Sequence, residues 1–240
     1  MTSKNTLIIG TRGSALALAQ ADMVRAALSA LHPGLDIRRE IIRTTGDRRM
    51  DVPLADVARV SGIVDKGIFI KELETALLEG RIDVAVHSLK DVPSELAPEF
   101  RLPAVLPRAA AEDVLITKEP DWNGRGTLAT GSVRRRLMAR TYWGRQLRFE
   151  DLRGNVPTRL EKLVEHPEWD AVILAKAGLE RLGLYAPETV VQGRKLYMRP
   201  LPVEAFIPAV GQGIVGMECR ASDRKTKELL AGINDVETCA

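Results

Sequence analysis

The sequence predicts an α/β protein with two lobes. Short aliphatic runs alternate with longer helical segments, a pattern typical of sheets that helices cover on both faces. The series strand–helix–strand–helix–strand begins near the N-terminus, and a similar series follows in the second half of the chain. Hydrophobic residues make up 45% of the 240 residues and aromatic residues only 4%, so we expect aliphatic cores.

The first series starts with a short apolar run at residues 7–9 that ends at Gly10, which predicts a buried strand. Ser14 is a suitable N-cap for a helix that runs to Leu31, and the His-Pro-Gly sequence at 32–34 ends it. The remaining elements of this series are a strand over 35–43, a helix over 66–78 and a buried strand over 83–88.

The second series is built in the same way. We expect strands over 113–117, 127–130, 146–150 and 170–175, and helices from Ser132 through Arg140, over 156–165 and over 176–182. A buried strand over 214–219 and a helix over 221–233 follow. Two proline-containing segments, 101–108 and 198–208, are candidate crossings between the lobes, and ligands usually bind in the cleft between such lobes.

Arginines follow the ends of three predicted strands. They occur in the turns at 11–14, at 130–136 and at 151–159, and each turn also carries a glycine just before a helix. Free N–H groups at a helix N-terminus favour an anion, and arginine binds a carboxylate or phosphate through two hydrogen bonds. An ordinary capped helix with a surface arginine explains a single such turn equally well. Three turns together indicate a ligand with several negative groups.

The arginines at 134–136 lie in the first turn of their helix, where positive charge opposes the helix dipole. We therefore expect an anion to compensate them. Nucleic acid is the rival anion to a small ligand, but the net charge is only +3 and no aromatic residues alternate with these arginines.

Lys90 and Asp91 follow the strand predicted over 83–88. A surface ion pair of little value is the alternative interpretation. A carboxylate beside arginines stays ionised and can stabilise positive charge that develops during a reaction, so Asp91 is our candidate catalytic residue. We expect His87 to pack or to satisfy a backbone group rather than to catalyse.

Several classes of function are disfavoured. Two cysteines and three scattered histidines form no metal-ligand pattern, and Cys219 is expected to be a small core residue. No apolar run approaches the length of about 20 residues that spans a bilayer, and no signal sequence is visible, so we expect a cytoplasmic protein with reduced thiols. The glycines of residues 211–213 suggest a hinge or a backbone close to a partner.

Six stretches together closely resemble the hydroxymethylbilane synthase (porphobilinogen deaminase) family of tetrapyrrole biosynthesis: residues 10–20, 66–93, 130–136, 152–163, 170–184 and 207–220. The resemblance runs from about residue 6 to the end. It implies a transferase that condenses four porphobilinogen molecules head to tail into hydroxymethylbilane, with release of ammonia, primed by a covalently bound dipyrromethane cofactor. The acetate and propionate arms of the pyrroles are the anions that the arginines require.

The resemblance also implies roles for individual residues. Asp91 is the catalytic carboxylate, which stabilises the cationic intermediate and the pyrrole nitrogens. The cofactor-binding positions are Lys90, Asp91, Thr130, Ser132, Arg134 and Arg135. The positions that bind substrate or the growing chain are Arg12, Ser14, Gln20, Lys66, Phe69, Arg153, Arg159 and Arg181.

The family fold resembles periplasmic binding proteins, with two lobes, a central cleft and a third small α+β domain. We expect lobe one to comprise residues 1–106 plus about 208–228, and lobe two residues 107–207. The chain ends where the third domain should begin, so we expect that domain to be absent and 229–240 to be its start. A natural short form and a shortened chain both fit. Residues 56–65 are an apparent insertion.

The family attaches its cofactor through a cysteine of the third domain, and neither Cys219 nor Cys239 matches that cysteine. Two functions therefore stay open at this point. The first is an active hydroxymethylbilane synthase, and the second is a catalytically impaired two-lobed binding protein for pyrrole carboxylates. We expect porphobilinogen as the small-molecule substrate, a monomer, and neither nucleic acid nor membrane as a partner.

Overall fold

The computed structural model describes residues 6–44 and 70–239, which form two compact α/β units. The first unit contains the described parts of residues 1–49, 55–109 and 214–240, and the second contains residues 110–213. The chain therefore leaves the first unit after Ala109 and returns to it at Ile214. Each unit is described by itself below, and the cleft expected between the lobes stays a prediction.

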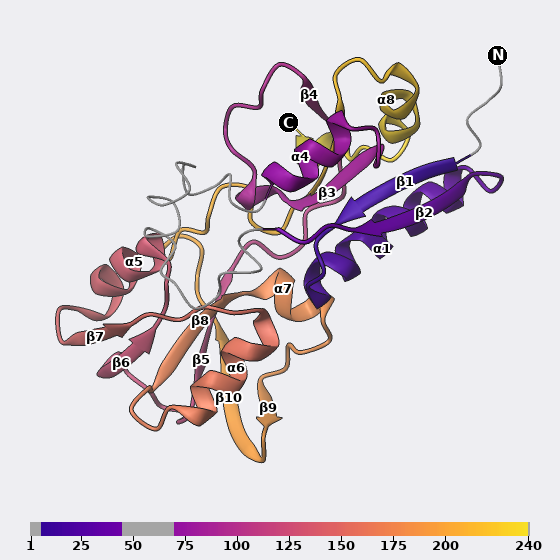
Figure 1. The fold of residues 1–240 in the computed structure, drawn as a ribbon. Coiled ribbons are helices and arrows are strands. Elements are labelled where there is room, and N and C mark those ends of the chain that lie inside the picture. The colour runs from indigo at the N-terminus through magenta and orange to yellow at the C-terminus, as the bar shows by residue number, and fades with distance from the viewer. Residues whose placement is uncertain (1–5, 45–69, 240) are drawn as a thin grey trace. The chain divides into compact units, whose positions relative to one another are not determined.

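The first unit is built on a five-stranded sheet with the order β2-β1-β3-β11-β4 (Figure 1). Its strands are β1 (Thr6–Thr11), β2 (Asp36–Ile41), β3 (Val84–Ser88), β4 (Phe100–Val105) and β11 (Val215–Arg220). β1 is parallel to both β2 and β3, whereas β11 is antiparallel to β3 and β4. The carboxyl ends of β1, β2 and β3 therefore lie at one edge of the sheet.

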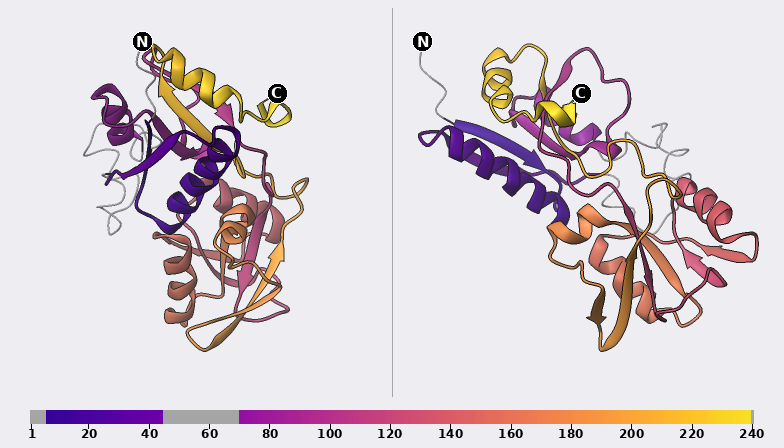
Figure 2. Two further views of the ribbon diagram at one scale, coloured as in Figure 1. Left: turned by 90° about the vertical axis from the view of Figure 1, so that its right-hand side faces the viewer. Right: turned by 180° about the vertical axis from the view of Figure 1, so that it is seen from behind.

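Helices cover both faces of this sheet. They are α1 (Ala15–Leu31), α4 (Lys71–Leu78), α8 (Arg224–Ala231) and the short α9 (Val236–Cys239). Because successive side chains of a strand point to opposite faces, Leu7 and Ile9 of β1 pack with α1 and α8, whereas Ile8 packs with α4. Figure 2 shows α1 running beside β1 and β2 from two further directions.

The second unit is built on a six-stranded sheet with the order β7-β6-β8-β5-β10-β9. Its strands are β5 (Asp113–Thr117), β6 (Gly126–Ala129), β7 (Leu147–Glu150), β8 (Ala171–Ala175), β9 (Glu188–Val191) and β10 (Arg194–Pro200). β6, β7 and β8 are parallel, and β5 is antiparallel to β8. The first residue of β5 therefore lies at the carboxyl end of β8, where Asp113 pairs with Ala175.

Three helices cover the two faces of the second sheet: α5 (Val133–Trp143), α6 (Val156–Glu165) and α7 (Lys176–Arg181). Leu128 of β6 and Ile173 of β8 pack on the face of α5, and Ala129 and Val172 pack on the face of α6 and α7. Both units thus have the covered sheets that the alternating pattern predicted, with aliphatic cores. Among residues 6–44 and 70–239, none of the helices has the length and apolar character needed to cross a membrane.

The predicted caps of two helices are confirmed. The Ser14 hydroxyl accepts a hydrogen bond from the Ala17 N–H at 3.3 Å, and the Ser132 hydroxyl accepts one from the Arg135 N–H at 3.4 Å. Each serine satisfies one of the N–H groups that a helix start leaves without a partner. Of the helix expected over 66–78, the described part is α4, and residues 66–69 lie outside the described part of the chain.

β4 occupies most of the segment 101–108, and the last three residues of β10 begin the segment 198–208. The chain passes between the units just beyond these segments, after Ala109 and before Ile214. Pro103 is tolerated because β4 is an edge strand, and Pro200 is the last residue of β10. Strand β9 escaped prediction altogether. Gln192 and Gly193 form the tight turn that joins β9 to β10, with φ angles of 48° and 78°, respectively, and a two-residue turn with positive φ at both positions fits a hairpin.

Candidate active site

One edge of the first sheet collects several of the predicted site residues. β1 and β3 are parallel neighbours, with Ile9 paired to Val84 and Gly10 to Ala85. The turns that follow the two strands therefore leave the same edge of the sheet. The turn after β1 carries Arg12 and Ser14, and the turn after β3 carries Lys90 and Asp91. Ligands of α/β sheets bind outside the carboxyl ends of their strands, as the sequence predicted for these residues.

Gln20 holds α1 against the end of β3. Its side chain is only 3% exposed, its Nε2 donates to Ser88 Oγ at 2.8 Å, and Ser88 Oγ lies 3.2 Å from Gln20 Oε1. This buried pair fixes the strand that leads to Asp91. The role of Gln20 toward a substrate stays a prediction.

Asp91 is the last residue of a short 3-10 helix, η2 (Leu89–Asp91). The Leu89 N–H donates to the Ile214 carbonyl at 2.9 Å, and the Val92 N–H donates to the Leu89 carbonyl at 3.0 Å, so both ends of the turn are fixed. The Asp91 side chain is partly exposed, and its carboxylate accepts no hydrogen bond from any residue that the structure describes. The carboxylate is therefore available to a ligand at this edge.

His87 lies on β3 shortly before this turn and is buried, as predicted, but its partner is a side chain. Its Nε2 lies 2.9 Å from Oε2 of Glu218 on β11. The charges of this pair also act on Glu74 of the neighbouring helix α4. Burial and the Glu218 carboxylate raise the pKa of Glu74, and His87 opposes that shift. The first unit thus has a buried acid–imidazole pair that ties β11 to the strand carrying the candidate catalytic turn.

The corresponding edge of the second sheet collects the other predicted residues. β6, β7 and β8 are parallel, so their carboxyl ends lie together. The residues that follow these ends are Thr130, Ser132, Arg134 and Arg135 after β6, Arg153 and Arg159 after β7, and Arg181 after β8. The sheet thus brings all seven to one edge of a single unit.

The anion that the arginines of α5 require is supplied by the protein itself. Asp113, the first residue of β5, is fully buried, and its two carboxylate oxygens lie 2.7 Å from Arg134 Nη2 and 2.7 Å from Arg135 Nη2. Burial alone would raise the pKa of Asp113, but the two guanidinium groups outweigh it and the pKa lies below its ordinary value. The expectation that only an external anion compensates these arginines was therefore incomplete.

The turn between β6 and α5 is rigid. The Ser132 N–H donates to Thr130 Oγ1 at 3.2 Å, and Arg136 Nε donates to the Thr130 carbonyl at 3.0 Å. Arg136 also forms an ion pair with Asp151, which follows β7. Thr130 and Ser132 thus shape the backbone at the start of α5.

Arg159 and Arg181 are anchored through backbone carbonyls. Arg159 Nε donates to the Gly154 carbonyl at 2.7 Å, and Gly154 adopts a φ of 121°, which favours glycine. Arg181 Nη2 donates to the Gly213 carbonyl at 2.6 Å. Arg181 Nε is buried and has no acceptor among the described residues, and burial lowers the pKa of this guanidinium. A buried donor without an acceptor is a position for a ligand oxygen.

Two residues of this edge were missed by the sequence analysis. Asp113 looked like an ordinary strand residue, although an acid at the start of an aliphatic strand signals a buried partner. Gln212 lies between two glycines, and its Nε2 donates to the Ala111 carbonyl at 2.7 Å and to Asp113 Oδ1 at 3.1 Å. Lys66, Phe69 and the insertion at 56–65 lie outside the described residues.

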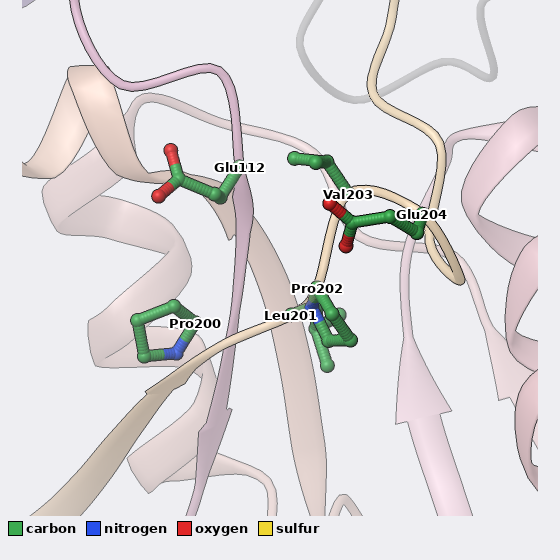
Figure 3. Close-up of a pocket in the computed structure, with 6 residues that line it drawn as sticks. All are labelled: Glu112, Pro200, Leu201, Pro202, Val203 and Glu204. Carbon is green, nitrogen blue, oxygen red and sulfur yellow. The ribbon is translucent and has the colours of Figure 1, made fainter.

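A shallow pocket of about 520 Å³ lies beside the first residue of β5 in the second unit (Figure 3). Its lining residues are Glu112, Pro200, Leu201, Pro202, Val203 and Glu204. It contains none of the predicted site residues, and its two glutamates disfavour a ligand with several carboxylates. Among residues 6–44 and 70–239, no group of three or more His, Cys, Asp or Glu side chains is placed to hold a metal ion.

The two sheets define the class of this protein as a two-unit α/β fold. Solved structures support the fold. The BenM effector binding domain with its effector benzoate matches with a TM-score of 0.53 and 15% identity over 95% of this chain and 90% of that one. The L-cystine solute receptor of Neisseria gonorrhoeae matches with a TM-score of 0.50 and 15% identity over 99% and 89%.

The chain belongs to the porphobilinogen deaminase family. Residues 7–228 match the family described as porphobilinogen deaminase, dipyromethane cofactor binding domain. The porphobilinogen deaminase of Syntrophotalea carbinolica is 43% identical over 98% of this chain and 71% of its own length. That of Roseiflexus sp. is 44% identical over 97% of this chain and 72% of its own length. The resemblance inferred from the sequence motifs is thus confirmed.

The residues of the second edge fit a group with several carboxylates. Arg181 Nε is a buried donor without an acceptor, and Arg135 Nη1 has no protein acceptor within the described part of the chain. Both cysteines belong to the first unit: Cys219 is a fully buried residue of β11, as predicted, and Cys239 is exposed on α9. The edge can therefore hold the dipyrromethane cofactor of the family through ion pairs and hydrogen bonds.

Proposed function

We propose that this chain is a porphobilinogen deaminase that condenses four porphobilinogen molecules head to tail into hydroxymethylbilane and releases ammonia. The observation that carries the proposal is the family match over residues 7–228 together with the arginine-lined edge that follows β6, β7 and β8. The reaction belongs to tetrapyrrole biosynthesis. The sequence relatives reported above are named as an enzyme, porphobilinogen deaminase, which favours catalysis over a role in binding alone.

The arginines bind the carboxylate arms of the pyrroles. Arg134 and Arg135, with Thr130, Ser132 and Lys90, are proposed to hold the dipyrromethane cofactor, whose bound form supplies the primer for condensation. The substrate and the growing chain are assigned to a second set: Arg12, Ser14, Gln20, Lys66, Phe69, Arg153, Arg159 and Arg181. What supports the first set is the geometry at the start of α5, where the guanidinium groups of Arg134 and Arg135 lie together on Asp113.

Asp91 is proposed as the catalytic residue. When porphobilinogen loses ammonia from its aminomethyl group, positive charge spreads over the methylene carbon and the pyrrole nitrogen. A carboxylate held at the end of β3 stabilises that charge and accepts a hydrogen bond from the pyrrole N–H. The support for this role is that the Asp91 carboxylate is partly exposed and accepts no hydrogen bond from the described residues.

The porphobilinogen site takes a small molecule, and we propose that the protein acts as a cytoplasmic monomer without nucleic acid or membrane as a partner. The support is the resemblance to the family and the small net charge of +3. Sedimentation of the purified chain tests the monomer, since one chain has a mass of 26.4 kDa and a dimer would have twice that mass.

Turnover of porphobilinogen tests the function. The full chain is first incubated with preformed hydroxymethylbilane, and its intact mass and its colour with an acidic aldehyde reagent for pyrroles then show whether a pyrrole adduct is present. We expect ammonia release from porphobilinogen and formation of the linear tetrapyrrole. Absence of both the adduct and ammonia release, from a protein that is folded by circular dichroism, would refute the proposal for this chain.

A further inference from the structure

The Asp113 carboxylate accepts hydrogen bonds from three side chains of the second unit, two on α5 and one in the loop with Gln212. Its Oδ1 accepts from Arg135 Nε at 3.2 Å, from Arg135 Nη2 at 2.7 Å and from Gln212 Nε2 at 3.1 Å, and its Oδ2 accepts from Arg134 Nη2 at 2.7 Å. The Asp113 side chain is fully buried, and that of Arg135 is 7% exposed. These hydrogen bonds restrict the orientation of both guanidinium groups.

The charges of this cluster do not cancel. Two guanidinium groups face one carboxylate, so one positive charge remains for a ligand. Asp113 engages Nε and Nη2 of Arg135 but leaves Nη1 without a protein acceptor among the residues described. Arg134 donates through Nη1 to the Ile207 carbonyl at 2.6 Å. The cluster is thus a fixed cation, with the Arg135 donor Nη1 still available to an incoming carboxylate.

The same cluster holds the chain segment that leads out of the unit. Gln212 donates to both Asp113 and the Ala111 carbonyl, and Arg181 donates to the neighbouring Gly213 carbonyl. Gly211 and Gly213 have φ angles of 70° and 89°, so the backbone of this loop depends on glycine. The loop that suggested a hinge or a close partner is therefore tied to the residues around Asp113.

We propose that Asp113 is a positioning residue, which orients Arg134 and Arg135 before a pyrrole carboxylate binds. The inference rests on the proposed function, because it assumes that these two arginines hold pyrrole carboxylates. Ordering a long side chain costs conformational entropy, and a site whose arginines are already fixed avoids that cost on binding. Asp113 itself touches no ligand and acts through the two guanidinium groups.

The affinity for a carboxylated pyrrole tests the inference. The probe is a free dipyrromethane that carries the acetate and propionate arms of the cofactor and lacks the aminomethyl group, because it keeps the carboxylates assigned to Arg134 and Arg135 and cannot be condensed. Calorimetric titration of the full chain is expected to show affinity at least about 10-fold weaker for Asp113→Asn than for the wild type, since a truncated buried charge contact typically costs this much or more. Affinity of Asp113→Asn equal to that of the wild type would overturn the inference.

Asp170→Asn is the matched control. Asp170 lies just before β8 in the same unit and accepts a hydrogen bond from the Thr127 N–H at 2.6 Å, so its loss also removes a carboxylate contact but touches no arginine. We expect Asp170→Asn to lower the melting temperature and to leave probe affinity within about 2-fold of the wild type. A loss of affinity equal to that of Asp113→Asn would assign the effect to stability and overturn the inference.

A double-mutant cycle separates the inference from the function on which it rests. If Asp113 acts through the arginines, adding Asp113→Asn to Arg134→Gln/Arg135→Gln should not weaken probe binding further. Full additivity would refute the positioning role alone. Unchanged probe binding by Arg134→Gln/Arg135→Gln would instead refute the proposed role of these arginines.

Guanidinium NMR of the wild-type chain covers the case in which Asp113→Asn does not fold. A guanidinium group held by a buried carboxylate rotates slowly about its Nε–Cζ bond. We therefore expect slow rotation for Arg135 before any probe is added, and the same spectrum for its Nε after saturation. Fast rotation of Arg135 in the free protein would show that the arginine is not fixed in advance and would overturn the inference.

Discussion

Nε2 of His87 and Oε2 of Glu218 lie 2.9 Å apart in the first unit, with side chains that are 5% and 0% exposed. His87 is paired with Gly216 across the antiparallel strands β3 and β11, so Glu218 is its diagonal neighbour on the same face. The other Glu218 oxygen is buried and has no hydrogen-bond partner among residues 6–44 and 70–239. The pair therefore links β11 to β3, the strand that leads to the turn with Asp91.

Removing one member of this pair should cost more than removing both. His87→Leu leaves a buried carboxylate without its partner, and we expect a loss of about 3–5 kcal/mol in the free energy of unfolding. His87→Leu/Glu218→Met replaces both groups with apolar side chains and should cost less than His87→Leu alone. Urea unfolding of the wild type and the two variants measures this, and a double variant that costs as much as His87→Leu or more would contradict the account.

Arg220, the last residue of β11, binds α4, the residues before β3 and the residue before α8. Its Nη1 donates to the carbonyls of Leu77 and Ile82 at 2.7 and 2.6 Å, and its Nη2 lies 3.1 Å from Asp83 and 2.8 Å from Asp223. Arg220→Met leaves these acceptors without their donor, and we expect a loss of about 2–4 kcal/mol in unfolding free energy.

Arg224→Met is the control for that substitution. Arg224 forms an ion pair with Glu228 on the surface of α8, and its side chain is 88% exposed. An exposed pair of this kind contributes little, so the unfolding free energy should change by less than about 0.5 kcal/mol. Equal losses for the two arginines would show that the Arg220 contacts do not stabilise the fold.

The two cysteines should differ sharply in reactivity. Burial raises the pKa of the Cys219 thiol from 9.0 to about 11, so at pH 8 only about one molecule in a thousand carries the reactive thiolate. Cys239 is exposed. An aromatic disulfide reagent at pH 8 should therefore modify one thiol in the native protein and both in urea, and peptide mapping should place the native label on Cys239. Rapid native labelling of Cys219 would disprove the burial argument.

The sequence predicted most of the fold because each strand that it identified is a short aliphatic run between polar turns. The residues at 171–175 and 215–219, for instance, became β8 and most of β11. β4 and β10 were missed because their prolines argue against a strand, and only the sheet order shows that Pro103 lies on an edge. Sequence spacing alone does not reveal which strands lie at an edge.

The site was predictable where it depends on local order along the chain. Arginine, glycine and serine after a strand mark the turns that carry Arg12, Arg134 and Arg153. The acid at the start of β5 signals a buried partner, but the sequence did not show which partner, because β5 is antiparallel to β8 and this reversal alone brings Asp113 to the edge with the arginines. A contact between residues 113 and 135 depends on sheet topology, which the local pattern does not specify.

The central claim is that Asp91 is the catalytic residue. Its most direct test compares Asp91→Asn with the wild type in two measurements: ammonia release from porphobilinogen, and affinity for a porphobilinogen analogue that lacks the aminomethyl group. Loss of an electrostatic stabiliser should slow ammonia release by about 100- to 1000-fold, while affinity stays within about 3-fold, because the arginines that hold the carboxylates remain. Melting temperatures confirm that both proteins are folded. Ammonia release by Asp91→Asn at the wild-type rate would contradict the account.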